Sequence, residues 1–180
     1  MLDQARYEEL RAEAGDRDIL DVIDISLLTR LSDSLLELGA GIVAIKCGLK
    51  GYYLRTAGAG RLQKLGDLGL EIEEWADREL LCQALEAREF VSSTGAGDSS
   101  IAGFLGALLR GGKPEFALRA ATTTAWYCLQ TVDASSGIPD FSEVEKTAGR
   151  DLPQIQHMTD RQGRYDGKER VWRLPKDKDF

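Results

Sequence analysis

A turn of small residues between a short apolar segment and a long apolar helix is the feature that most constrains the fold. The turn covers residues 93–98 and reads STGAGD. Over residues 95–110, apolar side chains recur at helical spacing, namely Ile101, Phe104, Leu105, Leu108 and Leu109. Small residues before such a helix let successive backbone N–H groups converge at the positive end of its dipole. The turn therefore predicts a site for phosphate or another anion.

Asp98 is the unusual member of this turn, because a carboxylate beside an anion pocket repels the anion. Asp98 would act as a general base if it takes a proton from a nucleophile that attacks a phosphoryl group held by the turn. The alternative is that Asp98 only stabilises the first helical turn, by about 0.3–1 kcal/mol. The spacing alone leaves both interpretations open.

Before this turn, helical and strand patterns alternate along the chain. Residues 3–14 and 25–38 predict two amphipathic helices. Residues 42–46 (IVAIK) predict a short buried strand of the kind found in parallel sheets. Residues 51–56 (GYYLRT) and a segment from Arg61 flank a glycine-rich stretch that predicts a hairpin or a short loop. This order indicates an α/β fold.

The second half of the chain is mainly helical in pattern. Within residues 66–90, residues 79–87 (ELLCQALEA) have helical spacing, whereas residues 89–91 (EFV) lead into the turn and could end a strand, so both interpretations stay open. Residues 114–131 predict a helix with many small residues. A last short helix is expected from Ser142 to Thr147. The polar residues 149–180 form a tail with Trp172 and Leu174 as anchors, which either packs across the body as a strap or is mobile.

Composition narrows the classes of function. The 180 residues carry 30 acidic and 23 basic side chains, a net charge of −7, which argues against binding to nucleic acid. No apolar run approaches the roughly 20 residues that a membrane span needs, so we expect a cytoplasmic protein that does not bind membranes. The single histidine, His157, excludes a two-histidine metal site, and Cys47, Cys82 and Cys128 are expected to be reduced and buried.

Two standard phosphate-binding motifs are excluded. Residues 106–113 (GALLRGGK) differ from a Walker A loop, because the first glycine is out of register and Pro114 stands where Ser or Thr would bind magnesium. Residues 95–100 (GAGDSS) lack the third glycine of the dinucleotide-binding motif. The chain is therefore neither a P-loop NTPase nor a Rossmann dehydrogenase.

Residues 93–111 (STGAGDSSIAGFLGALLRG) resemble the C-terminal signature of the PfkB or ribokinase family of carbohydrate kinases. Residues 35–56 are similar to the helix, strand, glycine-containing nucleotide loop and following strand of that family. The resemblance implies a ribokinase-like three-layer α/β/α fold with a mostly parallel sheet. Residues 1–148 would form its C-terminal nucleotide-binding part and residues 149–180 a polar C-terminal tail.

The resemblance also implies a function, the ATP-dependent phosphorylation of a hydroxyl group on a sugar or related small molecule such as a nucleoside. Asp98 would be the catalytic base, and the N–H groups of Gly95, Ala96 and Gly97 would form the anion hole. The cofactors would be ATP and Mg²⁺. The residues expected to border the nucleotide are Thr94, Gly48, Gly51, Ala121, Thr124 and Gly137.

The sequence departs from the family in three respects. The N-terminal half with its lid and sugar-binding residues is absent from this sequence, and the Asn-x-x-Glu motif associated with magnesium cannot exist in a chain without Asn. Ser92 stands where members that bind a monovalent cation often have Asp. The alternative function is therefore a non-catalytic nucleotide-binding fragment or subunit. Because a truncated sheet leaves an unpaired edge, we also expect a homo-oligomer or a partner chain that covers this edge.

Overall fold

The computed structural model of the chain describes residues 4–158 and 162–180. In this part of the chain the strands form one five-stranded sheet in the order β1-β2-β3-β5-β4. Every neighbouring pair in the sheet is antiparallel. The strands are β1 (Ile42–Lys46), β2 (Tyr52–Thr56), β3 (Glu79–Cys82), β4 (Arg164–Asp166) and β5 (Val171–Arg173).

The prediction of a mostly parallel sheet was wrong. β1 and β2 pair with each other, with Ile42 opposite Thr56 and Lys46 opposite Tyr52. Only residues 47–51 join them, and a parallel pair would need a crossover of a dozen or more residues. The expected partner of β2 from Arg61 onward is instead the short helix α3 (Ala59–Leu62). A hairpin thus joins β1 to β2, in place of the crossover that a parallel pair requires.

The predicted helices are confirmed, with small shifts at their ends. The expected helix over 3–14 begins at Gln4, since residue 3 lies outside the described residues. Asp24 caps α2, because its Oδ1 accepts a hydrogen bond of 2.8 Å from the Leu27 amide. Pro114 stands in the first turn of α6, where its missing N–H costs nothing. The helices are α1 (Gln4–Ala14), α2 (Ile25–Glu37), α3, α4 (Ile72–Trp75), α5 (Ala96–Leu108), α6 (Pro114–Cys128) and α7 (Phe141–Ala148).

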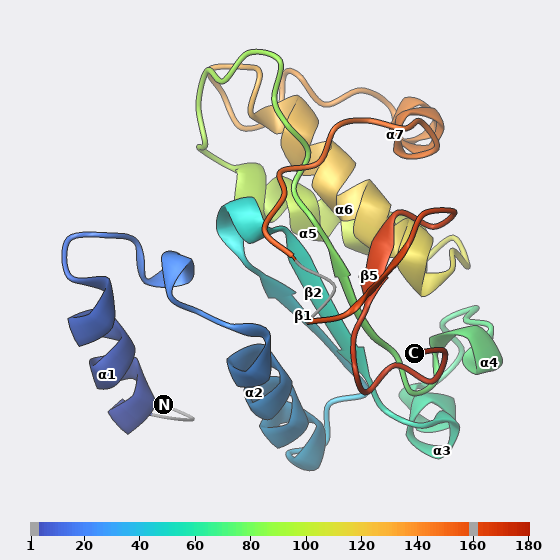
Figure 1. Cartoon of the computed structure of the whole chain (residues 1–180). Coiled ribbons are helices and arrows are strands. Elements are labelled where there is room, and N and C mark those ends of the chain that lie inside the picture. The colour runs from blue at the N-terminus through green and yellow to red at the C-terminus, as the bar shows by residue number, and fades with distance from the viewer. Residues whose placement is uncertain (1–3, 159–161) are drawn as a thin grey trace.

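Helices cover both faces of the sheet, so that three layers result (Figure 1). Tyr52 and Leu54 of β2 belong to a core with Phe104 of α5, and the rings of Tyr52 and Phe104 stack with centroids 5.7 Å apart. The intervening residue Tyr53 belongs to a second core, which includes Leu28 of α2. The alternation along β2 thus places α5 and α6 on one face and α2 on the other.

The C-terminal segment is part of the sheet, as a strap rather than a mobile tail. β5 pairs with β3 through Leu80 and Arg173, and the predicted anchors Trp172 and Leu174 are buried. Beyond β5, the buried carboxylate of Asp177 accepts a hydrogen bond of 2.9 Å from Nε of Arg78. The C-terminal segment therefore extends the sheet beyond β3 and is buried against the core there. In the described part of the chain, no helix is long and apolar enough to cross a membrane.

Candidate active site

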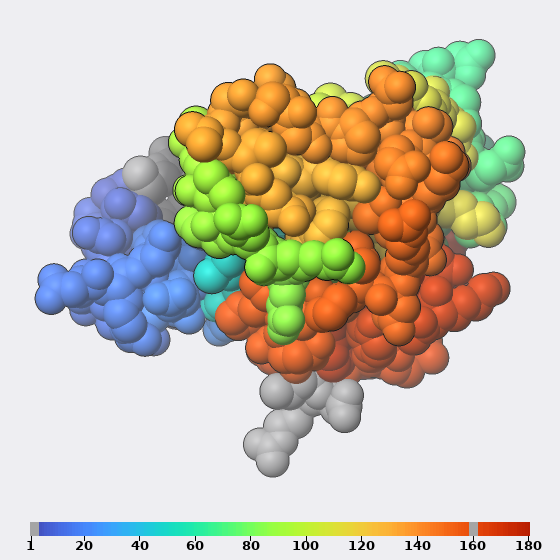
Figure 2. Space-filling view, turned by 90° about the horizontal axis from the view of Figure 1, so that it is seen from above, coloured from blue at the N-terminus to red at the C-terminus, as the bar shows by residue number. Residues whose placement is uncertain are grey.

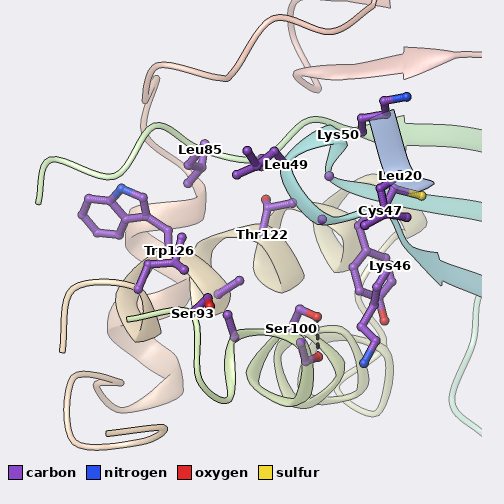
Figure 3. Close-up of a pocket in the computed structure, with 18 of the residues that line it drawn as sticks. Leu20, Lys46, Cys47, Leu49, Lys50, Leu85, Ser93, Ser100, Thr122 and Trp126 are labelled. Carbon is purple, nitrogen blue, oxygen red and sulfur yellow. Dashed lines mark hydrogen bonds between the residues drawn. The ribbon is translucent and has the colours of Figure 1, made fainter. Parts of the chain in front are cut away.

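A cavity of about 430 Å³ lies at one end of the sheet, between the β1–β2 loop and the beginning of α5 (Figure 3). This volume is in the range of small-molecule sites. Figure 3 shows Trp126 and Leu85 at one end of the cavity and Lys46 and Cys47 at the other. The cavity therefore joins an apolar end to a polar end.

The β1–β2 loop forms one wall through the two glycines that the sequence predicted, Gly48 and Gly51, both of which line the cavity. Gly51 has φ +105°, and a Cβ there would lie 2.0 Å from the carbonyl oxygen of Cys82. Gly48 has φ +55°, and its Cβ would lie 2.8 Å from Leu20. Both positions require glycine because the loop is in left-handed conformations and in close contact with its neighbours.

The apolar end of the cavity is built by α6 and the segment before α5. The side chains of α6 that face it follow helical spacing and are Thr122, Ala125 and Trp126, and Leu129 lines it directly after the helix. Leu85 and Phe90 also line the cavity. The amides of Val91 and Ser92 donate hydrogen bonds to the carbonyl oxygen of Leu129, which holds this segment beside the end of α6. Figure 2 shows residues 85–92 next to the segment that follows α6 on the surface.

Four residues that the sequence assigned to the nucleotide do not line this cavity, namely Thr94, Ala121, Thr124 and Gly137. Ala121 is fully buried in the main core, and the Thr124 hydroxyl donates to the carbonyl oxygen of Ala120 at 2.7 Å. Both lie on the face of α6 that packs against α5, where a Cβ on Gly103 would meet Thr124 Oγ1 at 2.4 Å. Gly137 packs instead on Thr131 in the loop after α6. Because successive helical residues differ by about 100° in direction, the predicted face of α6 is next to the one that lines the cavity.

Of the three amides in the turn before α5 that were expected to bind an anion, that of Ala96 is engaged within the turn. Gly95 is left-handed with φ +79°, and a Cβ there would lie 2.3 Å from the Cβ of Ala134. The Ala96 amide donates to Ser93 at 3.2 Å. Within the described residues, the amides of Gly95, Gly97 and Asp98 have no acceptor in the protein. The N-terminus of α5 thus keeps donors for an anion, and Ala96 and Gly97 line the cavity.

The other predicted residues of this turn lie around its outer side. Thr94 is exposed, its amide donates to Ser92 Oγ at 3.1 Å, and its carbonyl oxygen accepts from Cys128. The Asp98 side chain is 92% exposed, with Oδ1 3.9 Å from Nζ of Lys46. Ala96 and Gly97 of the turn thus line the cavity, whereas the carboxylate of Asp98 is exposed to solvent.

Lys46 is the polar residue of the site that the sequence analysis missed. It ends β1, two residues before Gly48, and its Nζ lies 3.1 Å from the position of a Cβ on Gly97. A charged residue that ends an otherwise apolar strand, just before a glycine loop, was the signal that could have identified it. The hairpin brings this strand end next to α5.

The remaining titratable groups do not form a metal site. All three cysteines are free and buried, as predicted. Burial raises the pKa of the Cys47 thiol to about 11, so that it stays protonated at neutral pH. Among residues 4–158 and 162–180, no three His, Cys, Asp or Glu side chains come together in a way that could hold a metal ion. The described residues thus fit an anionic ligand with an apolar part and form no cage for a metal.

The sequence profile described as pfkB family carbohydrate kinase matches residues 8–140. The chain belongs to this family. No curated protein matches the sequence at a significant level. Family membership agrees with the resemblance that the turn at 93–98 predicted.

Three solved structures show the ribokinase-like α/β fold of the family. The chain is similar to ribokinase from Arabidopsis thaliana complexed with ribose and ATP, with a TM-score of 0.57 and 24% identity over 80% of this chain and 39% of that one. For ribokinase from Thermotoga maritima the TM-score is 0.50 and the identity 23%, over 79% of this chain and 40% of that one. For a nucleoside kinase from Methanocaldococcus jannaschii the TM-score is 0.51 and the identity 19%, over 81% of this chain and 37% of that one. The chain thus spans about two fifths of the length of these pfkB-type kinases.

Proposed function

We propose that the chain carries the nucleotide site and the catalytic base of an enzyme that transfers the γ-phosphoryl group of ATP to a hydroxyl group of a sugar or nucleoside. The observation that carries this proposal is the combination at the start of α5. Gly97 lines the cavity, its amide has no acceptor among the described residues, and the Asp98 carboxylate stands on the same turn. Membership of the pfkB family supports it.

The cavity has a suitable place for each part of the nucleotide. The adenine would lie between Trp126 and Leu49, which line the apolar end, where a flat aromatic base gains most from desolvation. The phosphates would extend toward Gly97, whose amide is free to donate. Mg²⁺ would enter with the nucleotide and neutralise part of its charge.

In the transfer step, the oxygen of the acceptor hydroxyl forms a bond to the γ-phosphorus, and Asp98 accepts the proton that this hydroxyl loses. The bond between the γ-phosphorus and the oxygen that bridges to the β-phosphate breaks, and ADP leaves with the electron pair. The amides at the start of α5 donate to the oxygens on which charge develops. Each of these roles uses a group that the described chain itself supplies.

The exposure of Asp98 favours a second candidate, a nucleotide-binding subunit without activity of its own. A side chain that is 92% exposed has no acceptor pocket around it in the described residues. The acceptor would then be held by a surface from another part of a complete enzyme. β1 pairs only with β2 among the described strands, so its free edge is our proposed place for a second copy or a partner chain.

Calorimetric titration with ATP and a phosphoryl-transfer assay over sugars and nucleosides separate these functions. The proposed enzyme binds ATP and transfers phosphate, and Asp98→Asn abolishes transfer while ATP affinity changes little. Asp140→Asn is the matched control, since Asp140 is exposed and caps α7 without a side-chain hydrogen bond. ATP binding without transfer to any acceptor would support the second candidate, and no binding by the folded chain would refute both.

A further inference from the structure

One residue of the cavity wall comes from outside the part of the chain that the family profile matches. The profile covers residues 8–140, whereas His157 lines the cavity from the C-terminal segment. The His157 side chain is exposed, and within the described residues its imidazole has no hydrogen-bond or ion-pair partner. One ring nitrogen of a neutral imidazole donates and the other accepts, so both are available to a ligand in the cavity.

Backbone pairing holds the residues before His157 against the segment that follows β3. Gln154 forms an isolated antiparallel bridge with Leu85, and the amide of Ile155 donates to the carbonyl oxygen of Ala84 at 2.8 Å. Both Ala84 and Leu85 line the cavity. The C-terminal segment therefore reaches the cavity beside its apolar wall.

A buried glutamine fixes this segment to the core. Gln83 is 1% exposed, and its Nε2 donates to the carbonyl oxygen of Ile155 at 2.8 Å. Its Oε1 accepts a hydrogen bond of 2.8 Å from Nε1 of Trp172 in β5. Gln83 thus joins two parts of the C-terminal segment and is a positioning residue for His157.

The β1–β2 loop packs on the same residues as the C-terminal segment. A Cβ on Gly51 would lie 2.8 Å from the amide nitrogen of Ala84. Met158 packs against the second core, which contains Cys47 at the start of this loop. Figure 1 shows the C-terminal segment passing beside the loop between β1 and β2. His157 therefore lies where the loop and the apolar wall meet.

We propose that the C-terminal segment is part of the nucleotide site and that His157 is a specificity-determining residue, which binds the base. This inference rests on the proposed function, in which the base lies between Trp126 and Leu49. The segment pairs with the apolar wall at Leu85, so it meets the base rather than the phosphates. The edge of adenine presents an amino donor and ring-nitrogen acceptors, which match the acceptor and the donor of the imidazole.

The test compares ATP, adenosine and inorganic tripolyphosphate by calorimetric titration of the full chain. We expect His157→Ala to weaken ATP and adenosine binding by the same factor, about three- to tenfold, since it removes a hydrogen bond between neutral groups. Tripolyphosphate has no base, so its affinity should stay unchanged. His157→Gln keeps a donor and an acceptor and should recover part of the adenosine affinity. Gln156→Ala is the matched control, because this neighbouring side chain is exposed and does not line the cavity.

The outcomes separate this inference from the function on which it rests. If the unchanged protein binds ATP and His157→Ala binds it equally well, the role of His157 is refuted while the proposed function stands. An equal loss for all three probes, or a lower melting temperature of the variant, would also refute the role, because His157 would then support the cavity as a whole. If the folded, unchanged protein binds none of the three probes, the proposed function and the inference both fail.

Discussion

Replacement of Asp177 by alanine tests whether the C-terminal segment is an integral part of the core. The Asp177 side chain is completely buried and accepts hydrogen bonds from Arg78 Nε at 2.9 Å and from Arg173 Nη1 at 3.2 Å. It also accepts hydrogen bonds from the backbone amides of Glu79 at 3.1 Å and Asp179 at 3.0 Å. The alanine variant therefore removes the acceptor of four donors at once.

The expected loss follows from what remains in the core. Arg78 is 1% exposed, and after the change its guanidinium keeps Glu115 as its buried partner while Nε has none. Removal of one member of a buried ion pair destabilises by about 3–5 kcal/mol, because the other charge stays desolvated. Total stabilities of such domains are about 5–15 kcal/mol. Asp177→Ala should thus remove a large fraction of the free energy of unfolding.

Urea denaturation followed by tryptophan fluorescence measures this loss. The matched control is Asp179→Ala, two residues further on, whose side chain is 53% exposed and pairs with the same two arginines at 3.3 and 3.8 Å. Exposed pairs contribute about 0–1 kcal/mol, so this control should change the midpoint little. Equal midpoints for the two variants would refute the argument that burial of the Asp177 carboxylate holds the C-terminal segment.

Three further predictions concern the loop, a helix cap and a buried thiol. Gly51→Ala should lower the free energy of unfolding by about 2–5 kcal/mol, because its φ of +105° and a carbonyl oxygen 2.0 Å from the new Cβ exclude a side chain. Gly60→Ala, where a new Cβ meets no atom, should leave the stability unchanged. Equal shifts of the two variants in thermal melts would contradict this. Partial burial acts to raise the pKa of Asp24, but hydrogen bonds from the first turn of α2 outweigh it and lower the pKa below the ordinary 3.8. Its stabilising effect is therefore present above that pH and lost as the pH falls through the lowered folded value. The deficit of Asp24→Ala, about 1 kcal/mol at pH 7, should thus shrink in acid denaturation as the pH falls below the ordinary pKa of 3.8. Burial raises the pKa of Cys47 to about 11, so alkylation of the native protein at pH 8 should be slow and accelerate toward pH 11; a rate equal to that of the unfolded chain at pH 8 would show that the thiol is not protected.

The helices and the turn before α5 could be predicted because their signals are local. Apolar spacing, the glycines at 95 and 111 and Pro114 act within a few residues of where the helices begin and end. The same holds for Gly48 and Gly51, whose left-handed conformations belong to a short loop. These residues determine local backbone geometry whatever surrounds them.

The strand β3 could not be assigned because its burial hides the usual alternation. All four residues from Glu79 to Cys82 are buried, so no face of the strand is polar and exposed. Glu79 accepts a hydrogen bond of 2.7 Å from the Tyr53 hydroxyl, a partner 26 residues away in the sequence. A buried carboxylate with so distant a partner appears in the sequence as an ordinary surface residue.

The sequence also could not show which face of α6 lines the cavity. The spacing of small residues identified a packed helix, and the residues on its two adjacent faces, Ala121 with Thr124 and Thr122 with Ala125, have similar size and polarity. Contact with α5 decides which pair is in the core, because Gly103 lets α5 approach Thr124 closely. The sequence predicts that such a helix packs closely, and only its partner determines which face remains for a ligand.

The sequence by itself determined the glycine turn before α5, the helices and the family, because these depend on interactions between near neighbours in the chain. The tertiary structure alone decided the antiparallel direction of the sheet, the entry of the C-terminal segment beside β3, and the approach of Lys46 to Asp98. These features depend on hydrogen bonds and burial between residues far apart in the sequence, for which local spacing carries no signal.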